Sequence, residues 1–116
     1  MCDAIHFAEE LSGRYRQDRK GLPVVSISDP GHLSCVGNDY GYEEIFVRQL
    51  KVFGKKGDVL VGISASGNSP NLLTAFEYAA VSGIKTVALT AFDGGKMKEL
   101  ADQGVHVPTG MKEYGP

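Results

Sequence analysis

The chain has 116 residues, of which 42% are hydrophobic and 22% are charged, and its formal net charge is −2. Residues 1–116 fit one domain of ordinary size, and without a basic excess a nucleic acid is a poor candidate partner. The sequence opens with no signal peptide and has no apolar run long enough for a membrane span. We therefore expect a cytoplasmic protein whose cysteines, Cys2 and Cys35, stay reduced.

Helices and strands alternate along the predicted chain. Apolar residues at helical spacing predict helices over residues 1–15, 42–53, 70–82 and 97–102. Short β-branched runs predict strands over residues 22–28, 59–63, 85–89 and 105–108. Such alternation, with short connections, predicts an α/β fold in which helices cover both faces of a parallel sheet in three layers (αβα).

Three polar loops, residues 28–42, 64–70 and 90–96, follow predicted strands at the sheet edge where parallel α/β folds bind ligands. The second loop enters a helix directly, so its backbone N–H groups and the helix dipole suit an anion. Ser64, Ser66 and Ser69 add hydroxyl donors. The loop has neither the lysine of a Walker A motif nor G-x-G-x-x-G spacing, which favours a small phosphorylated metabolite over a nucleotide.

The alternative interpretation of this loop is purely structural. Ser69 precedes Pro70 at the position of a helix N-cap, and the other serines are suited to local turn bonds. The residue pattern alone leaves both interpretations open.

Two polar pairs are further candidates. His6 and Glu10 are four residues apart, so on a helix they share one face and could hold a divalent ion, or belong to a solvated face. Asn38 and Asp39 lie in the sequence VGNDYG, between a predicted strand and a predicted helix. The Asp39 carboxylate could accept hydrogen bonds from two sugar hydroxyls, or serve only as an N-cap.

Three stretches together resemble one family. HFAEELSGRY, SCVGNDYG and GDVLVGISASGNSPNLLTAF occur in the order found in phosphoheptose isomerases, members of the sugar isomerase (SIS) domain superfamily. The resemblance implies a flavodoxin-like SIS domain and the conversion of sedoheptulose 7-phosphate to D-glycero-D-manno-heptose 7-phosphate through an enediolate, for lipopolysaccharide biosynthesis. It also implies a zinc ion at each site and a cytoplasmic homotetramer with active sites between subunits.

The same resemblance implies roles for individual residues. Glu10 matches the proposed catalytic base, and His6 and Glu10 match two of the zinc ligands. The substrate-binding positions of the family fall on Glu10, Asn38, Asp39, Ser64, Ala65, Ser66 and Ser69.

This chain is shorter than the members of the family that it resembles. Members of the family also have an N-terminal helical segment, a first strand that ends in a Gly-Asn-Gly-Gly-Ser loop, and a C-terminal helix with a glutamine and a histidine. These parts contribute two further zinc ligands, the proposed acid and an interior strand, without which backbone groups stay unpaired. We therefore expect a partial SIS domain over residues 1–116, inactive by itself.

Two other functions remain open at this point. One is a non-catalytic SIS-domain protein that binds a replication initiator, and the other is a sugar-phosphate-binding regulator. A histidine and a carboxylate one helical turn apart, His6 and Glu10, favour the isomerase because a binding module has no need of them.

Overall fold

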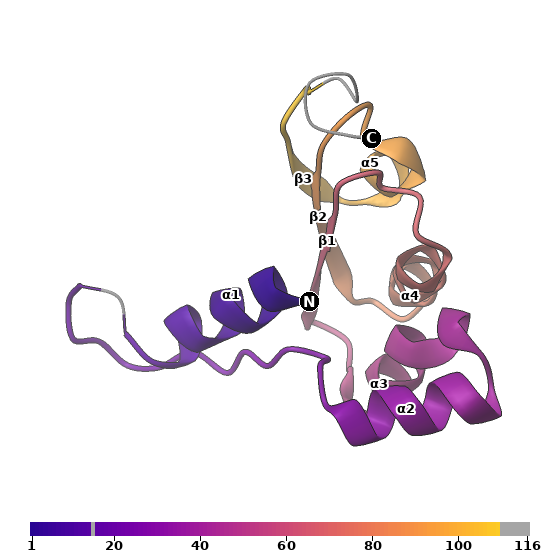
Figure 1. The fold of residues 1–116 in the computed structure, drawn as a ribbon. Helices are drawn as coiled ribbons and strands as arrows, with labels where there is room; N and C mark the ends of the chain where they lie inside the picture. The colour runs from indigo at the N-terminus through magenta and orange to yellow at the C-terminus, as the bar shows by residue number, and fades with distance from the viewer. Residues whose placement is uncertain (15, 110–116) are drawn as a thin grey trace.

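A computed structural model of the protein describes residues 1–14 and 16–109. Helices and strands alternate through most of this range (Figure 1). In chain order they are α1 (Cys2–Ser12), α2 (Pro30–Asp39), the 3₁₀-helix η1 (Tyr42–Glu44), α3 (Ile45–Phe53), β1 (Val59–Ser64), α4 (Pro70–Val81), β2 (Lys85–Thr90), α5 (Gly95–Leu100) and β3 (Gln103–His106). Among the described helices, none combines the length and the apolar character needed to span a membrane.

The strands form a parallel sheet in the order β1-β2-β3. Because successive residues of a strand face opposite sides, the two faces contact different helices. Gly62 and Ala88 face α4 and α5, where Phe76 lies against both. Ile63 and Leu89 face the other way and line a cavity with residues of α1. Figure 1 shows α1 and α4 on opposite sides of the strands, so the predicted three-layer arrangement is confirmed.

The apolar core lies on the α4 side of the sheet. One buried cluster joins α3 to α4 and the start of β2, and consists of Val47, Leu50, Ala75, Ala79 and Ile84. A second joins α4, β2 and α5, and consists of Phe76, Ala88 and Met97. Burial of a large apolar side chain such as Phe76 or Met97 contributes about 1.5–3 kcal/mol. These contacts fix α4, and therefore the loop before it, relative to the sheet.

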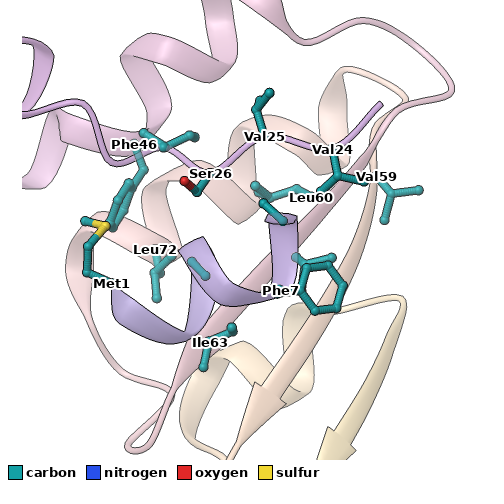
Figure 2. A pocket seen from close by; sticks show the side chains of 14 residues that line it. Met1, Phe7, Val24, Val25, Ser26, Phe46, Val59, Leu60, Ile63 and Leu72 are labelled. Carbon is teal, nitrogen blue, oxygen red and sulfur yellow. The ribbon is translucent and has the colours of Figure 1, made fainter. Parts of the chain in front are cut away.

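The prediction of a strand over residues 22–28 is wrong. The backbone hydrogen bonds of this segment run from Leu22 N–H to Leu11 O and from Val24 N–H to Leu22 O, and β1 pairs on one side only, with β2. A strand needs a neighbouring strand at about 4.8 Å, and in the described residues no backbone bond joins this segment to β1. Both instead line one apolar cavity (Figure 2). Its walls include Val24, Val25, Ser26, Ile27, Val59, Leu60, Val61 and Ile63, with Met1, Ala4, Phe7 and Ala8 from α1.

The expectation that residues 28–42 form a loop is also wrong, because α2 occupies most of this range. The Asp29 carboxylate accepts a hydrogen bond from His32 N–H at 2.9 Å, and Pro30 stands in the first turn. An aspartate N-cap followed by proline is a strong helix start. The sequence DPGH is also suited to a tight turn, so its residues alone do not distinguish a turn from the start of a helix.

The remaining elements agree with the prediction within a few residues. The helix expected over residues 1–15 is α1, although residue 15 lies outside the described residues. The range 42–53 contains η1 and α3, and residues 70–82, 59–63 and 85–89 correspond to α4, β1 and β2. Both α5 and β3 begin two residues earlier than predicted, at Gly95 and Gln103.

Candidate functional site

The loop that connects β1 to α4, residues 65–69, is folded by its own serines. Ser64 Oγ accepts a hydrogen bond from Gly67 N–H at 3.1 Å, and Ser66 Oγ accepts one from Asn68 N–H at 3.2 Å. These are the local turn bonds of the structural interpretation. They do not exclude a ligand, because a hydroxyl that accepts a bond still has its own proton to donate.

Several donors of this loop have no protein acceptor. Ser69 stands at the N-cap of α4, but its side chain makes no capping bond. Within residues 1–14 and 16–109, the N–H groups of Ala65, Ser66 and Ser69 donate to no protein atom. Unpaired N–H groups at the start of a twelve-residue helix, with the positive end of the helix dipole, suit an anion.

The turn between β2 and α5 forms hydrogen bonds with this loop and holds it in place. Ala91 N–H donates to Ala65 O at 3.0 Å, and Met97 N–H donates to Gly67 O at 2.9 Å. The Asn68 side-chain oxygen accepts from Lys96 N–H at 3.0 Å. Residues 90–96 were predicted only as a polar loop, because no local sequence pattern reveals which backbone groups a turn will contact.

Close approach of two glycine segments fixes the spacing between loop and turn. Gly67 has φ +69°, and a Cβ atom placed on it would collide with the carbonyl oxygen of Gly94. A Cβ on Gly95 would meet Ser66 O at 2.5 Å. Only glycine fits both requirements at position 67, a left-handed backbone and no side chain.

His6 and Glu10 meet on α1 as predicted. His6 Nε2 lies 3.3 Å from Glu10 Oε1 and 4.0 Å from Glu9 Oε1. One ligand atom from each of these three side chains lies within 4.8 Å of the others. An imidazole with carboxylates is a donor set that zinc accepts, so these residues fit the metal. Glu9 was not among the predicted ligands, and its place in this cluster follows from the structure alone.

The His6–Glu10 pair faces the sheet from the side opposite α4. Both residues line a cavity together with Ile63 and Leu89, and Ile63 directly precedes Ser64. The pair and the serine loop therefore both lie near the carboxyl end of β1, one over the face of the sheet and one at its edge. The cavity at His6 and Glu10 is not lined by Ser64, Ser66 or Ser69.

Asn38 and Asp39 occupy the last turn of α2, not a loop. The Asn38 amide donates to Asp39 Oδ1 at 3.0 Å, and the Cys35 thiol donates to Asp39 Oδ2 at 3.6 Å. The N-cap alternative for Asp39 is wrong, since Gly41 holds that position before η1. The helix α2 contacts η1, and η1 contacts α4. These contacts connect the helix that carries the pair to α4, which follows the serine loop.

Comparisons with known proteins identify relatives of this chain. A family model described as the SIS domain matches residues 1–91. Proteins named phosphoheptose isomerase from Tolumonas auensis and Vibrio cholerae are 61% and 60% identical over 107 residues, which is 92% of this chain and 56% of each relative. The resemblance found in the three motifs is thus confirmed, and the chain spans about half the length of these curated relatives.

A solved structure supports the same assignment. The phosphoheptose isomerase GmhA from Neisseria gonorrhoeae is 39% identical, with a TM-score of 0.85 over 93% of this chain and 58% of that one. The family match agrees with the fold described above, in which helices cover both faces of a parallel sheet and the serine loop precedes α4. The chain belongs to the SIS domain family.

Proposed function

We propose that this protein is a phosphoheptose isomerase, which interconverts sedoheptulose 7-phosphate and D-glycero-D-manno-heptose 7-phosphate through an enediolate. The observation that carries the proposal is the combination of about 60% identity to proteins of that name with a serine loop of unpaired donors at a helix N-terminus. Because the chain spans about 56% of those relatives, the activity is proposed for the whole protein.

The phosphate group is assigned to the loop between β1 and α4. The Ser66 hydroxyl has a proton to donate, and so does one of the two hydroxyls of Ser64 and Ser69, whose oxygens share a hydrogen bond at 3.4 Å. The N–H groups of Ala65, Ser66 and Ser69 have no protein acceptor in the described chain. These donors are neutral, so selectivity for an anion comes from the dipole of α4 and from the number of converging N–H groups.

The proton transfer is assigned to Glu10. Isomerisation moves a proton between C1 and C2 of the sugar, which needs one group that accepts the proton and returns it. Glu10 is a carboxylate beside His6, on the wall of the cavity that reaches Ile63 at the end of β1. His6 and Glu10 would also hold a zinc ion, which when bound supplies Lewis-acid stabilisation of the enediolate oxygens.

The sugar hydroxyls are assigned to Asn38 and Asp39. An exposed carboxylate with an amide beside it offers acceptors and donors to vicinal hydroxyls. Assembly as a homotetramer in the cytoplasm, with each site completed by another subunit, fits the exposure of both this pair and His6. A role in building the heptose of surface lipopolysaccharide follows from the substrate.

The test is exchange of the C1 proton of sedoheptulose 7-phosphate in deuterated water, on purified protein of measured intact mass, with and without added zinc. Exchange above a protein-free control, with formation of the aldose phosphate, supports the proposal. Binding of the sugar phosphate without exchange would replace the isomerase with a regulator. Absence of both exchange and binding would favour a protein-binding SIS domain.

A further inference from the structure

Tyr40, the residue that follows Asp39, packs its ring against the side chain of Arg48. The guanidinium carbon of Arg48 lies 3.4 Å from the centre of that ring. Tyr40 is the C-cap residue of α2, and Arg48 belongs to α3. A guanidinium over an aromatic face forms a favourable cation–π contact. This contact therefore joins the last turn of α2 to α3.

The surroundings of Arg48 agree with a stacked guanidinium. Its Nε atom is buried, yet it forms no hydrogen bond within residues 1–14 and 16–109. Glu44 Oε2 lies 3.9 Å from this nitrogen, which is beyond hydrogen-bonding distance. Burial of a donor without an acceptor is unfavourable, so a hydrogen bond at Nε does not explain the position of the side chain. The contacts that favour it are the stack on Tyr40 and the ion pair with Glu44.

The orientation of the Asp39 carboxylate depends on the helical turn that Tyr40 ends. One carboxylate oxygen accepts from the Asn38 amide at 3.0 Å, and the other accepts from the Cys35 thiol at 3.6 Å. Both donors belong to α2. Because they move with α2, the carboxylate moves with the last turn of that helix.

The helix α3 connects this turn to the core. It contacts α2, and the two helices lie side by side (Figure 1). Val47, which precedes Arg48, is buried with Ala75 and Ala79 of α4 in one apolar cluster. The helix α4 begins directly after the serine loop. The core therefore fixes α3 relative to that loop, and the stack on Arg48 fixes the last turn of α2 relative to α3.

We propose that Arg48 is a positioning residue for the Asp39 carboxylate, which it holds toward the sugar hydroxyls through the ring of Tyr40. The inference rests on the proposed function, which assigns Asp39 to those hydroxyls. A carboxylate that accepts from two vicinal hydroxyls must lie within hydrogen-bonding distance of both, so a shift of the last turn of α2 weakens both bonds. Arg48 needs no contact with the substrate for this role.

Two anions separate positioning from a general loss of stability. Inorganic phosphate has no sugar hydroxyls, so its binding at the serine loop does not depend on Asp39. Sedoheptulose 7-phosphate carries both kinds of group. Loss of the stack should therefore lower the affinity for the sugar phosphate alone, whereas partial unfolding would lower the binding of both anions.

The experiment measures both affinities by calorimetry for the whole protein and for its Arg48→Gln variant, at a temperature at which circular dichroism shows both to be folded. We expect sedoheptulose 7-phosphate to bind about 2- to 5-fold more weakly, the change in affinity equivalent to one partly exposed cation–π contact. Phosphate should bind as before. Lys51→Gln is the matched control, because Lys51 lies on the same helix, 5.6 Å from the ring centre of Tyr78. It should leave both affinities unchanged.

Variants of the ring test the same contact independently of any folding defect in Arg48→Gln. Tyr40→Phe keeps the aromatic face and should bind sedoheptulose 7-phosphate as wild type does, whereas Tyr40→Leu should show the loss expected of Arg48→Gln. Because the two residues act through one contact, the double variant should lose no more affinity than either single variant. Additive losses, an equal loss of phosphate affinity, or full affinity in Arg48→Gln or Tyr40→Leu would overturn the inference.

Asp39→Ala distinguishes failure of the proposed function from failure of this inference. If Asp39→Ala weakens the binding of the sugar phosphate while Arg48→Gln does not, Asp39 contacts the sugar and Arg48 does not position it. If Asp39→Ala binds the sugar phosphate as tightly as wild type, the assignment of Asp39 to the sugar is wrong, and the inference falls with it.

Discussion

The hydroxyl oxygen of Ser64, the last residue of β1, lies 3.4 Å from that of Ser69, the N-cap of α4. The end of a strand and the start of the next helix thus place two hydroxyls beside each other, with the four residues 65–68 between them. Neither hydroxyl caps the helix. The geometry leaves the first turn of α4 open to an external acceptor.

The first prediction concerns these hydroxyls. Ser66→Ala and Ser69→Ala should each weaken the binding of inorganic phosphate by about 0.5–1.5 kcal/mol, the range for one neutral hydrogen bond. Calorimetry measures the change. Ser82→Ala is the control, because Ser82 caps the opposite end of α4. Equal affinity in all three variants would remove the hydroxyls from the site.

The second prediction separates backbone strain from close packing at the loop. Gly67 and Gly57 both have positive φ, +69° and +94°, but a Cβ atom would collide with Gly94 O at the first and meet nothing at the second. Both alanine variants pay about 1–2 kcal/mol for the left-handed backbone. Gly67→Ala should lose more stability than Gly57→Ala in urea denaturation, and it alone should lose phosphate affinity because the loop must move away from the β2–α5 turn. Equal losses would show that the turn does not position the loop.

A third prediction concerns the link between β2 and β3. The Asp102 carboxylate accepts from Thr86 N–H at 2.9 Å, and Asp102 N–H donates to Thr86 Oγ at 3.0 Å. Thr86 is 2% exposed, so Asp102→Ala leaves a buried N–H unpaired and should cost about 1–3 kcal/mol. Asp102→Asn retains an oxygen acceptor and should lose less. Urea denaturation of both variants measures the two losses, provided that the dependence of the unfolding free energy on urea is the same in each. Equal midpoints for Asp102→Ala and Asp102→Asn would contradict the prediction.

The fourth prediction is a pH dependence at the turn before β1. Hydrogen bonds from the side chain and backbone N–H of Lys55 lower the pKa of Asp58 below its ordinary value of 3.8. A lowered pKa in the folded state means that the stabilisation is present at neutral pH and is lost as the pH falls through the folded-state pKa. Asp58→Asn should therefore be less stable than wild type near pH 7, with a difference that shrinks below about pH 4. Salt should also shrink it, since the pair is exposed.

The elements that could be predicted from the sequence are those defined by local pattern. This holds for β1 and β2, with their apolar runs, and for α3 and α4, with their periodic apolar faces. Residues of these patterns form or pack against the buried clusters. The segment 22–28 has equally good strand composition, yet it forms no strand. Composition cannot supply a neighbouring strand, and pairing depends on what lies beside the segment in space.

The candidate site also has a part that could be predicted from local pattern and a part that could not. Two groups were predictable because each lies within one short stretch of sequence: the serines Ser64, Ser66 and Ser69, and the pair His6 and Glu10. The support of the serine loop by the turn between β2 and α5 was not predictable, since Lys96 N–H reaches the side-chain oxygen of Asn68 across 28 residues of the chain. Only the packed structure shows which backbone groups the turn contacts.

The last prediction concerns the proton transfer itself. Glu10→Gln keeps the size of the side chain and one hydrogen-bonding oxygen but removes the ability to accept a proton. In the active protein, it should retain affinity for sedoheptulose 7-phosphate and lose about 10²- to 10⁴-fold in C1 proton exchange, the usual contribution of a general base. Glu77→Gln is the matched control, because Glu77 is an exposed glutamate of α4 that lies outside the cluster of His6, Glu9 and Glu10. Because Glu10 is also assigned to the metal, zinc content is measured in both variants. Loss of exchange at full zinc content assigns the proton to Glu10, whereas full exchange by Glu10→Gln would exclude Glu10 as the base.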